Sequence, residues 1–408
     1  MQVWSATPNP HKYVYLDFHY KKRKMIERIL KKEARETADD FKVVCVTGPR
    51  QSGKTTLCRQ VFKDKPYISL EDPDVAAKAQ TNERDFLSQF KGGAILDEIQ
   101  RVPTLFNYLQ RVVDEKKKNN QFILTGSSNF LINEKISQSL AGRTGYIELL
   151  TFSISELKQS KIKSRSIEET LLQGFYPAVV TGTSSSKRWL DNYIKTYVER
   201  DARMIKNIGN IILFSKFLKL CAGRATQLLN VNNLAVEVGV DNKTISSWLG
   251  VLESSYIIFL LPPYYKNFNK RIIKAPKLYF YDTGVLCNLL NVHSVSALKR
   301  SEHYGALFEN LMITEIKKNR LNKEKSGQMY FFRDSAGNEV DMIIENEEGL
   351  LPVEIKASKK ADRHDLRGLK WFQKVFRQHR GILLHGGKTE TSHENEIQQL
   401  GWERVADI

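Results

Sequence analysis

The sequence has little cysteine, no long apolar segment and no leader pattern at its start. Its four cysteines lie far apart and form no CxxC pair: Cys45, Cys58, Cys221 and Cys287. This spacing predicts neither a disulfide framework nor a zinc ribbon, and it fits a reducing cytoplasm. The longest apolar run, residues 256–265, is too short to span a bilayer and contains Pro262 and Pro263. Residues 1–17 lack a basic stretch followed by an apolar core, so we expect a soluble cytoplasmic protein without a membrane partner.

Acidic residues are also scarce relative to basic ones. The 408 residues include 63 Lys and Arg but only 46 Asp and Glu, which gives a formal net charge of +17. An excess of this size favours a polyanionic partner, nucleic acid before membrane, although a solvated basic surface is the simpler alternative. The length and the 41% of hydrophobic residues exclude a wholly disordered chain and predict two or three domains.

Short β-rich segments alternate with helical segments after Phe41. The expected strands cover residues 43–46, 67–70, 94–96, 122–125 and 146–150. Strands that are separated by helices predict an α/β fold with a parallel sheet. A basic amphipathic helix is expected before them at residues 21–35, and the chain becomes mainly helical beyond Ser153.

Residues 48–55 read GPRQSGKT and match the phosphate-loop pattern GxxxxGK[ST]. They follow an apolar strand and precede a helix-like segment, and this context disfavours the alternative of a chance glycine-rich turn. In such a loop backbone N–H groups surround the phosphates of ATP, Lys54 bridges them and the Thr55 hydroxyl ligates Mg²⁺. The expected nucleotide-binding residues are Gly48, Pro49, Arg50, Gln51, Ser52, Gly53, Lys54, Thr55 and Thr56.

Polar residues that suit phosphate chemistry follow the next strands. Residues 94–96 end in Asp97, a candidate Mg²⁺ ligand, and Glu98, which we expect to polarise the attacking water. The strand at 122–125 leads to Ser127, our first choice for sensing the γ-phosphate or orienting water. Arg143 precedes the last strand and could stabilise transition-state charge at a neighbouring subunit, or it could be a surface arginine on a turn.

This order of parts resembles the AAA+ ATPases, in which an arginine at this position often acts in trans, so the resemblance implies a homo-oligomer. A closer resemblance is to a large prokaryotic family of AAA-type ATPases that carry a carboxyl-terminal domain of unknown function. It extends over nearly the whole chain and depends on the phrases GPRQSGKTTL, LDEIQR, LTGSS, SLAGR, TFSISEL and YVERD. The resemblance implies an AAA+ P-loop domain with the basic helix at 1–155, a helical lid and winged-helix-like segment at 156–265, and a restriction-endonuclease-like domain at 266–408.

Residues 232–261 fit a helix-turn-helix with a wing. A short helix at 232–238 would stop at Gly239, and Asp241 or Asn242 would cap a second helix at 243–253. The second helix would bury Ile245, Trp248, Leu249 and Leu252 and expose Asn242, Lys243, Thr244, Ser246 and Ser247. The exposed residues suit DNA contact, but a role as an ATPase lid or subunit contact carries equal weight.

A nuclease-like group of residues follows at 339–356. If residues 346–349 form the turn of a hairpin, Asp341 faces Glu354, and this opposition of like charges favours a divalent metal between them. Lys356 shares the face of Glu354, where it could lower the pKa of an attacking water. With Glu309 upstream as a third ligand, the set resembles the PD-(D/E)xK phosphodiesterases, which implies a second Mg²⁺ site. A nuclease fold that cleaves nothing is the alternative, and Pro352 suggests an edge strand.

A basic segment at 359–380 is expected to form a helix that packs Leu366, Leu369, Phe372 and Phe376 inward and exposes Lys359, Lys360, Arg363, Lys370, Lys374 and Arg377. That exposed face could bind phosphate backbones, or it could simply be solvated. The sequence therefore predicts an ATP-hydrolysing AAA+ protein that acts on DNA and carries a Mg²⁺-dependent nuclease-like domain. The alternative is a nucleotide-switched regulatory protein whose carboxyl-terminal domains only bind DNA or a protein partner.

Overall fold

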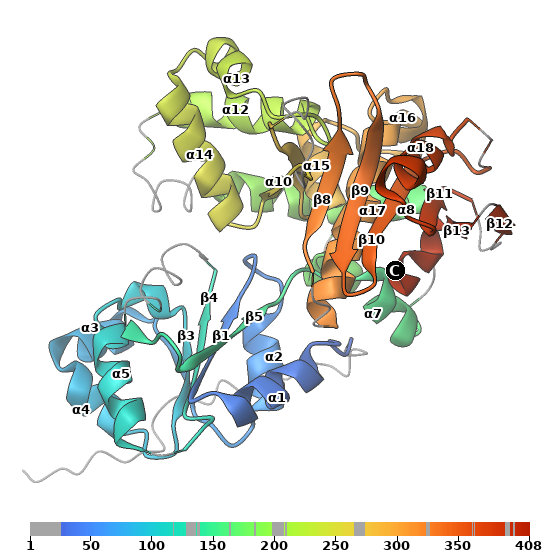
Figure 1. Ribbon diagram of the computed structural model, residues 1–408. Coiled ribbons are helices and arrows are strands. Elements are labelled where there is room, and N and C mark those ends of the chain that lie inside the picture. The colour runs from blue at the N-terminus through green and yellow to red at the C-terminus, as the bar shows by residue number, and fades with distance from the viewer. Residues whose placement is uncertain are drawn as a thin grey trace, which may run out of the picture.

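A five-stranded parallel sheet forms the centre of the amino-terminal lobe in the computed structural model (Figure 1). Its strands are β1 Val43–Thr47, β2 Tyr67–Ser69, β3 Ala94–Asp97, β4 Phe122–Gly126 and β5 Thr144–Glu148. Their spatial order is β2-β3-β4-β1-β5, and every pairing is parallel. The predicted α/β class is therefore confirmed, although β5 begins earlier than the sequence indicated.

The structure describes most of the chain in several stretches. They are residues 26–116, 118–127, 136, 139–162, 165–182, 185–197, 208, 210–264, 274–323, 327–360, 362, 364–387, 392–394 and 396–408. No helix in these stretches is both long and apolar enough to cross a membrane.

Helices cover both faces of the parallel sheet. Helices α1 Lys31–Asp40 and α2 Lys54–Val61 pack on one face, against Val44 and Val46. Helices α3 Pro73–Thr81, α4 Glu83–Ser88 and α5 Leu105–Glu115 pack on the other face, against Val43 and Cys45. A strand that is covered on both faces needs continuous apolar residues, which explains why the VVCV segment shows no alternation.

The basic helix predicted at residues 21–35 is wrong in part. Residues 21–25 lie outside the described residues, and the first described helix, α1, begins only at Lys31. Arg28, which precedes this helix, also does not lie on a solvated basic face, because it is buried and only 7% exposed.

A mainly helical region follows the first lobe. Its helices are α7 Ile154–Gln159, α8 Ile167–Gln173, α9 Pro177–Val180, α10 Ser186–Thr196, α12 Ile211–Gly223, α13 Val231–Val238, α14 Asn242–Ser254, α15 Thr283–Leu289 and α16 Val295–Arg300. Gly239 ends α13 with a positive φ of 88°, and the Asp241 carboxylate caps α14 by accepting a hydrogen bond from Thr244 N at 2.8 Å. The predicted pair of helices and their caps are confirmed.

The strand after α14 pairs with a later strand instead of ending a domain. Strand β6 Ile258–Leu261 is antiparallel to β7 Lys277–Phe280, on the other side of the boundary that we predicted at residue 265. The placement of the two later domain boundaries stays a prediction.

The carboxyl-terminal region contains a six-stranded mixed sheet. Its elements are α17 Tyr304–Asn322, β8 Met329–Arg333, β9 Glu339–Asn346, β10 Gly349–Lys356, α18 Arg367–Phe376, β11 Gly381–His385, β12 Ser392–Glu394, β13 Ile397–Gly401 and the 3₁₀ helix η3 Trp402–Asp407. The strand order is β12-β13-β11-β10-β9-β8. Helix α17 packs on one face of this sheet and α18 on the other.

The β9–β10 hairpin has the predicted register. Ile343 pairs with Pro352 and Asn346 with Gly349, as the two-residue turn requires. The expectation that Pro352 marks an edge strand is wrong, because β10 lies between β9 and β11. Proline is tolerated there since the pairing of β10 with β11 starts only at Val353, so no partner on that side needs its missing N–H.

Candidate nucleotide site and carboxylate hairpin

The phosphate loop connects β1 to α2 and presses closely against the residue after β5. At Gly48, φ is +146°, and a Cβ would lie 2.1 Å from the carbonyl oxygen of Leu149. Gly53 also has a positive φ, of +96°, and directly precedes α2. A side chain would clash with Leu149 at position 48 and would be strained by the positive φ at position 53. These two glycines therefore shape the loop at the positive end of the α2 dipole.

Lys54 lies inside this loop. Its side chain is buried, and Nζ donates hydrogen bonds to the carbonyl oxygens of Gly48 at 3.0 Å and Pro49 at 2.9 Å. Burial lowers the pKa of Lys54, and the nearby carboxylates of Glu98 and Asp97 oppose that shift. An ammonium group held by loop carbonyls stands where phosphate oxygens are bound in this kind of loop.

Asp97 lies at the end of β3 and accepts hydrogen bonds from hydroxyl groups on three other elements. Its Oδ2 accepts from Thr55 Oγ1 at 3.0 Å and from Tyr67 Oη at 2.5 Å, while its Oδ1 accepts from Thr125 Oγ1. The predicted pair of Thr55 and Asp97 is thus brought together. Tyr67 and Thr125 were not predicted, although each is a polar residue in or at the end of an otherwise apolar strand.

Glu98 and Ser127 also meet. Glu98 has a positive φ of 55°, and its Oε2 accepts hydrogen bonds from Ser127 Oγ at 3.2 Å and from Gln100 Nε2. The strained backbone turns this carboxylate out of the sheet toward the end of β4. Hydroxyl and carboxylate oxygens of the kind that Mg²⁺ prefers therefore converge beside the phosphate loop, from Thr55 and Asp97.

Arg143 lies away from the phosphate loop of its own chain. It precedes β5 and its carbonyl accepts a hydrogen bond from Val43 N, at the start of β1, whereas the loop follows the end of β1. Its guanidinium binds both oxygens of Asp114, with Nη2–Oδ2 at 2.7 Å, and these bonds hold the pKa of Asp114 well below its ordinary value. An action in trans, and with it the homo-oligomer, stays a prediction.

The helix-turn-helix module touches the nucleotide lobe. Tyr256, just after α14, is buried and donates a hydrogen bond from its hydroxyl to Thr47 Oγ1 at 2.8 Å. Thr47 directly precedes Gly48 of the phosphate loop. A lid on the ATPase must contact the nucleotide lobe, and this hydrogen bond is such a contact. DNA contact by the exposed face of α14 stays a prediction.

Asp341 and Glu354 lie at opposed positions beyond the last paired residues of the hairpin. Asp341 Oδ2 accepts a hydrogen bond from Ile355 N at 2.9 Å, and Lys356 Nζ binds Glu354 Oε1 at 2.7 Å. Glu354 Oε2 is shielded from solvent and has no hydrogen-bond partner. Burial, and then the charge of Asp341, raise the pKa of Glu354 to about 8.

Glu309 was predicted to be a third metal ligand beside Asp341 and Glu354, but it has other partners in the structure. Its Oε1 accepts a hydrogen bond from Tyr279 Oη at 2.7 Å and lies 3.5 Å from Lys277 Nζ. The same ammonium lies 2.6 Å from Glu339 Oε1 and 4.0 Å from Asp341 Oδ1. Within the described stretches, no group of three or more His, Cys, Asp or Glu residues could hold a metal ion.

Lys277 is the residue that sequence reasoning missed here. It is 3% exposed, and although burial would lower its pKa, the carboxylates of Glu309, Asp341 and Glu339 together raise it. A lysine at the start of the apolar strand β7 was the available signal, because a buried lysine needs carboxylate partners.

Three parts of the chain match known domain families. Residues 40–158 match the AAA domain, residues 164–296 match the domain of unknown function DUF8612, and residues 304–404 match the domain of unknown function DUF4143. Uncharacterised proteins of Mycobacterium tuberculosis and Mycobacterium bovis are each 30% identical to the chain over 306 residues, which cover 74% of this chain and 67% of theirs. The chain belongs to the family of these mycobacterial proteins. Its first lobe is a P-loop AAA-type ATPase domain.

The chain also resembles an archaeal protein and a solved archaeal structure. An uncharacterised protein of Methanocaldococcus jannaschii is 26% identical over 340 residues, which cover 75% of this chain and 73% of that protein. Among solved structures, a Walker-type ATPase of Pyrococcus abyssi aligns with a TM-score of 0.45 and 15% identity, over 65% of this chain and 96% of that one.

Proposed function

We propose that this AAA-domain protein hydrolyses ATP with residues 48–56 of the phosphate loop, Asp97, Glu98 and Ser127. The observation that carries the proposal is the meeting of Thr55, Asp97 and Glu98 at one end of the parallel sheet, with Thr55 Oγ1 and Asp97 Oδ2 3.0 Å apart. A phosphate loop needs such a pair of carboxylates to bind a metal–nucleotide complex and to activate water.

Each residue has a distinct task in this mechanism. Loop N–H groups orient the phosphates, and Lys54 exchanges its bonds to the carbonyls of Gly48 and Pro49 for bonds to phosphate oxygens. Thr55 and Asp97 would hold Mg²⁺, which neutralises charge on the phosphates when it is bound. Glu98 orients the attacking water and polarises its O–H bond, and Ser127 keeps the Glu98 carboxylate in place.

ATP turnover by purified protein tests this proposal. Lys54→Ala removes the cation that bridges the phosphates and should abolish turnover. Lys63→Ala, at an exposed position just after α2, is the matched control and should turn over ATP like the wild type. An unchanged rate in Lys54→Ala would contradict the proposal.

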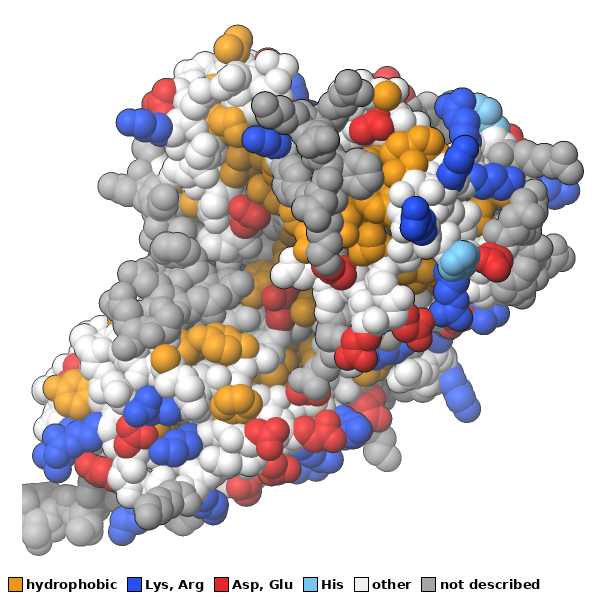
Figure 2. Space-filling model, in the orientation of Figure 1, with side chains coloured by type: hydrophobic (Ala, Val, Ile, Leu, Met, Phe, Trp, Pro, Cys, Tyr) orange, Lys and Arg blue, Asp and Glu red, His pale blue; other side chains and the backbone are white. Residues whose placement is uncertain are grey.

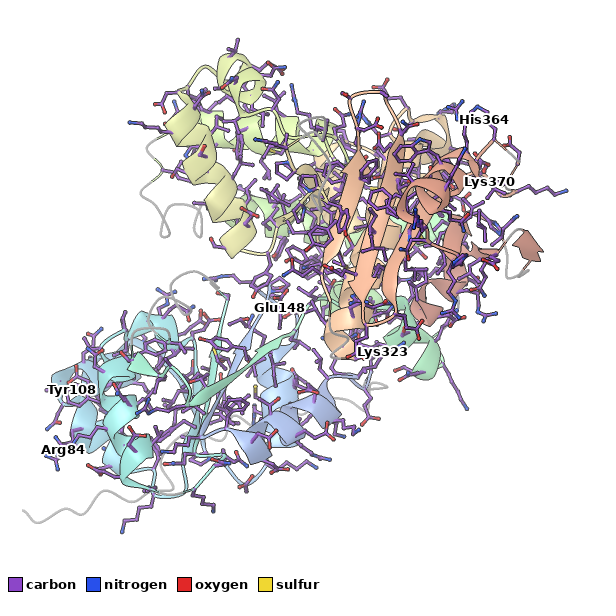
Figure 3. All side chains as sticks on the ribbon, in the orientation of Figure 1. Arg84, Tyr108, Glu148, Lys323, His364 and Lys370 are labelled. Carbon is purple, nitrogen blue, oxygen red and sulfur yellow. The ribbon has the colours of Figure 1, made fainter. Side chains whose placement is uncertain are left out.

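A basic surface around α18 supports an action on DNA. Helix α18 is shorter than the predicted 359–380, because it begins at Arg367 and ends at Phe376. Leu366, Leu369 and Phe372 are buried as predicted, Phe376 and Lys370 are half-buried, and Lys374 and Arg377 are exposed. Arg363 lies outside the described residues. Lys and Arg side chains gather over this part of the molecule (Figure 2), where Lys370 lies on the side away from the ATPase lobe (Figure 3). Helix α18 also passes close to the hairpin, because a Cβ on Gly368 would lie 3.5 Å from Glu354 Oε2.

Salt-dependent DNA binding tests the role of this surface. Replacing Lys374 and Arg377 with Gln should weaken binding to any DNA sequence and reduce the salt slope of log K by about 2. ATP turnover should be unchanged. Lys32→Gln with Lys187→Gln removes the same charge from other helices and should leave binding unaltered; equal weakening by both pairs would contradict a local surface.

Nuclease activity is the second candidate function. It is favoured by Asp341 and Glu354 at opposed positions of the hairpin, by the Lys356 ammonium on Glu354 Oε1, and by a Glu354 Oε2 that has no hydrogen-bond partner. The predicted three-ligand Mg²⁺ site does not fit, since the Lys277 ammonium already lies 3.5 Å from Glu309 and 4.0 Å from Asp341, so we derive no metal-dependent step. Cleavage of linear, circular, single-stranded and branched DNA with Mn²⁺ or Mg²⁺, and its loss in Asp341→Asn, would establish a nuclease. Absence of cleavage by the wild type would leave a binding domain, which is the regulatory alternative.

A further inference from the structure

Arg28 is a buried arginine that precedes the matched AAA domain in sequence and nevertheless contacts its phosphate loop. Its side chain is 7% exposed and donates in three directions. Nη1 donates to the carbonyl oxygen of Ser52 at 2.9 Å, Nη2 to the carbonyl oxygen of Leu150 at 2.7 Å, and Nε to Glu156 Oε1 at 2.8 Å. The bond to Ser52 is made to the backbone of the phosphate loop itself.

The contact fixes the orientation of one peptide group. In a trans peptide the C=O and N–H bonds point in opposite directions across a rigid plane, so the Ser52 carbonyl and the Gly53 N–H are turned together. Gly53 has a φ of +96°, a conformation in which neighbouring peptide planes turn easily because no Cβ restricts them. By binding the Ser52 oxygen, Arg28 fixes the direction of the Gly53 N–H, which points the opposite way, and N–H groups at the start of a helix are the groups that bind phosphates in such a loop.

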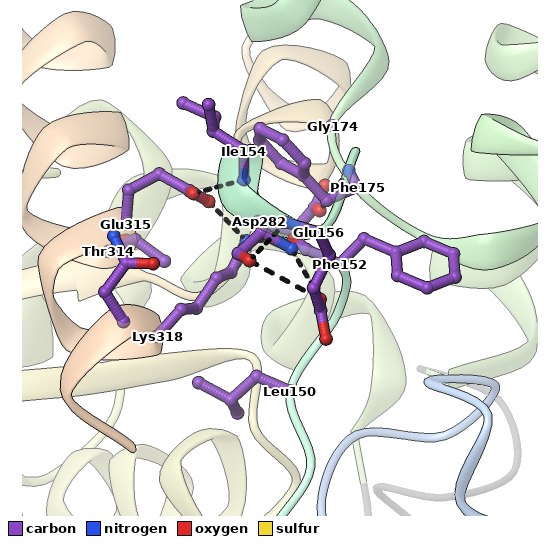
Figure 4. A network of polar contacts seen from close by, with 12 residues as sticks. Leu150, Phe152, Ile154, Glu156, Gly174, Phe175, Asp282, Thr314, Glu315 and Lys318 are labelled. Atoms are coloured by element: carbon purple, nitrogen blue, oxygen red, sulfur yellow. Dashed lines mark hydrogen bonds and ion pairs between the residues drawn. The ribbon is translucent and has the colours of Figure 1, made fainter. Parts of the chain in front are cut away.

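Arg28 is itself held by a buried network. Glu156 is 0% exposed and caps the first turn of α7, whose first residue, Ile154, donates its N–H to Glu315 Oε2 on α17 at 2.7 Å. Lys318 binds Glu315 Oε1 and the carbonyl oxygen of Phe152, each at 2.9 Å (Figure 4). A guanidinium anchored in this way cannot move without leaving buried charges unpaired, so its position is set before nucleotide arrives.

We propose that Arg28 is a positioning residue of the nucleotide site, which presets the Ser52–Gly53 peptide for phosphate binding. The inference rests on the proposed ATPase function and adds a residue from outside the AAA domain to its nucleotide site. It touches neither substrate nor metal and acts only through the loop backbone.

Two variants separate positioning from simple support. Arg28→Met and Glu156→Gln both break the buried ion pair, so both should lower the unfolding temperature. Only Arg28→Met removes the donor to the Ser52 carbonyl. We expect it to weaken Mg·ATP binding, measured by calorimetry, by about tenfold or more, as the loss of a charge-assisted hydrogen bond predicts. Glu156→Gln should change the ATP affinity by less than about threefold.

The alternatives give distinct results. Equal losses of ATP affinity in both variants, or an unchanged affinity in Arg28→Met, would overturn the inference. If Arg28→Met does not fold, Arg28→Lys keeps the charge beside Glu156 but has one nitrogen in place of a planar fork, so it cannot reach three acceptors that lie in different directions. It should still weaken ATP binding; wild-type affinity would refute positioning. Lys32→Met, whose lysine side chain is 84% exposed, is the control from the same segment. No ATP binding by the wild type would instead refute the proposed function.

Discussion

The two groups of carboxylates in this protein are balanced by different partners. Asp97 is surrounded by neutral hydroxyls from Thr55, Tyr67 and Thr125, whereas Glu309 and Asp341 face the ammonium of Lys277. Hydroxyl groups satisfy the oxygens of Asp97 without carrying a charge, and the nearby Lys54 ammonium is bonded to the carbonyls of Gly48 and Pro49, so Asp97 can still bind a cation directly. The Lys277 ammonium supplies a positive charge inside the second group, so that group is stabilised without a bound metal ion. Asp97 is thus held by hydrogen bonds from neutral groups, whereas Glu309 and Asp341 lie beside a buried counter-ion.

The largest expected effect lies at the first group. Glu98→Gln keeps the hydrogen bond from Ser127 but removes the charge that polarises water, and ATP turnover should fall by about 10²-fold or more. ATP binding should persist. Asp341→Asn is the matched change in the second group, and steady-state assays should find its ATP turnover unaltered. A similar loss in both variants would show that the two groups are not independent.

The second effect is on stability. Lys277→Met removes the ammonium that lies beside the buried carboxylates of Glu309 and Asp341, while Glu339 keeps its contact with Arg333, and it should lower the free energy of unfolding by about 3–5 kcal/mol. Urea titration of the full chain measures this loss. If Mn²⁺ then restores the stability of the variant but does not change that of the wild type, the Lys277 ammonium occupies the place of a metal ion and supplies its positive charge. Lys374→Met is the control at an exposed position. If Lys277→Met lowers the free energy of unfolding no more than Lys374→Met does, the proposed role of Lys277 is contradicted.

A third effect concerns pH. The pKa of Glu354 is raised to about 8 from an ordinary 4.5, mainly by burial, so between these values the folded chain keeps a proton that the unfolded chain has released. The stabilising contribution is therefore complete below the lower value and is lost as pH rises toward the upper one, at about 1.4 kcal/mol per pH unit. Unfolding free energies at pH 5.5 and 8 should show this decline, and Glu354→Gln should flatten it. The same slope in the variant would assign the decline to other groups.

Local patterns explain what could be predicted from the sequence. The strands of the first sheet are continuous apolar runs between polar segments, and the two-residue turn after Asn346 determines the register that opposes Asp341 to Glu354. The roles assigned to Lys54, Asp97 and Glu98 stay predictions, although the geometry brings these residues together.

Distant partners explain what was missed. Arg28 contacts Glu156, and Lys277 contacts Glu309 and Asp341. These partners lie far apart in the sequence, so helix and strand periodicity cannot predict their contacts. Arg143 is a different case. It precedes β5 whereas the phosphate loop follows β1, and because these two strands are parallel it lies at the opposite edge of the sheet from the loop of its own chain. Its action at a neighbouring subunit stays a prediction.

The smallest effect concerns the hydroxyls that distinguish the first group. Tyr67→Phe removes one of three hydrogen bonds to Asp97, the one of 2.5 Å to Oδ2, and leaves those from Thr55 and Thr125. The loss of one such bond, about 0.5–1.5 kcal/mol, should raise the Mg²⁺ concentration needed for half-maximal ATP turnover by about two- to tenfold. Tyr108→Phe, at a 40% exposed position on α5 labelled in Figure 3, is the matched control. If Tyr67→Phe leaves the Mg²⁺ dependence unchanged, neutral hydroxyls do not orient Asp97, and the contrast between the two groups reduces to the presence of Lys277.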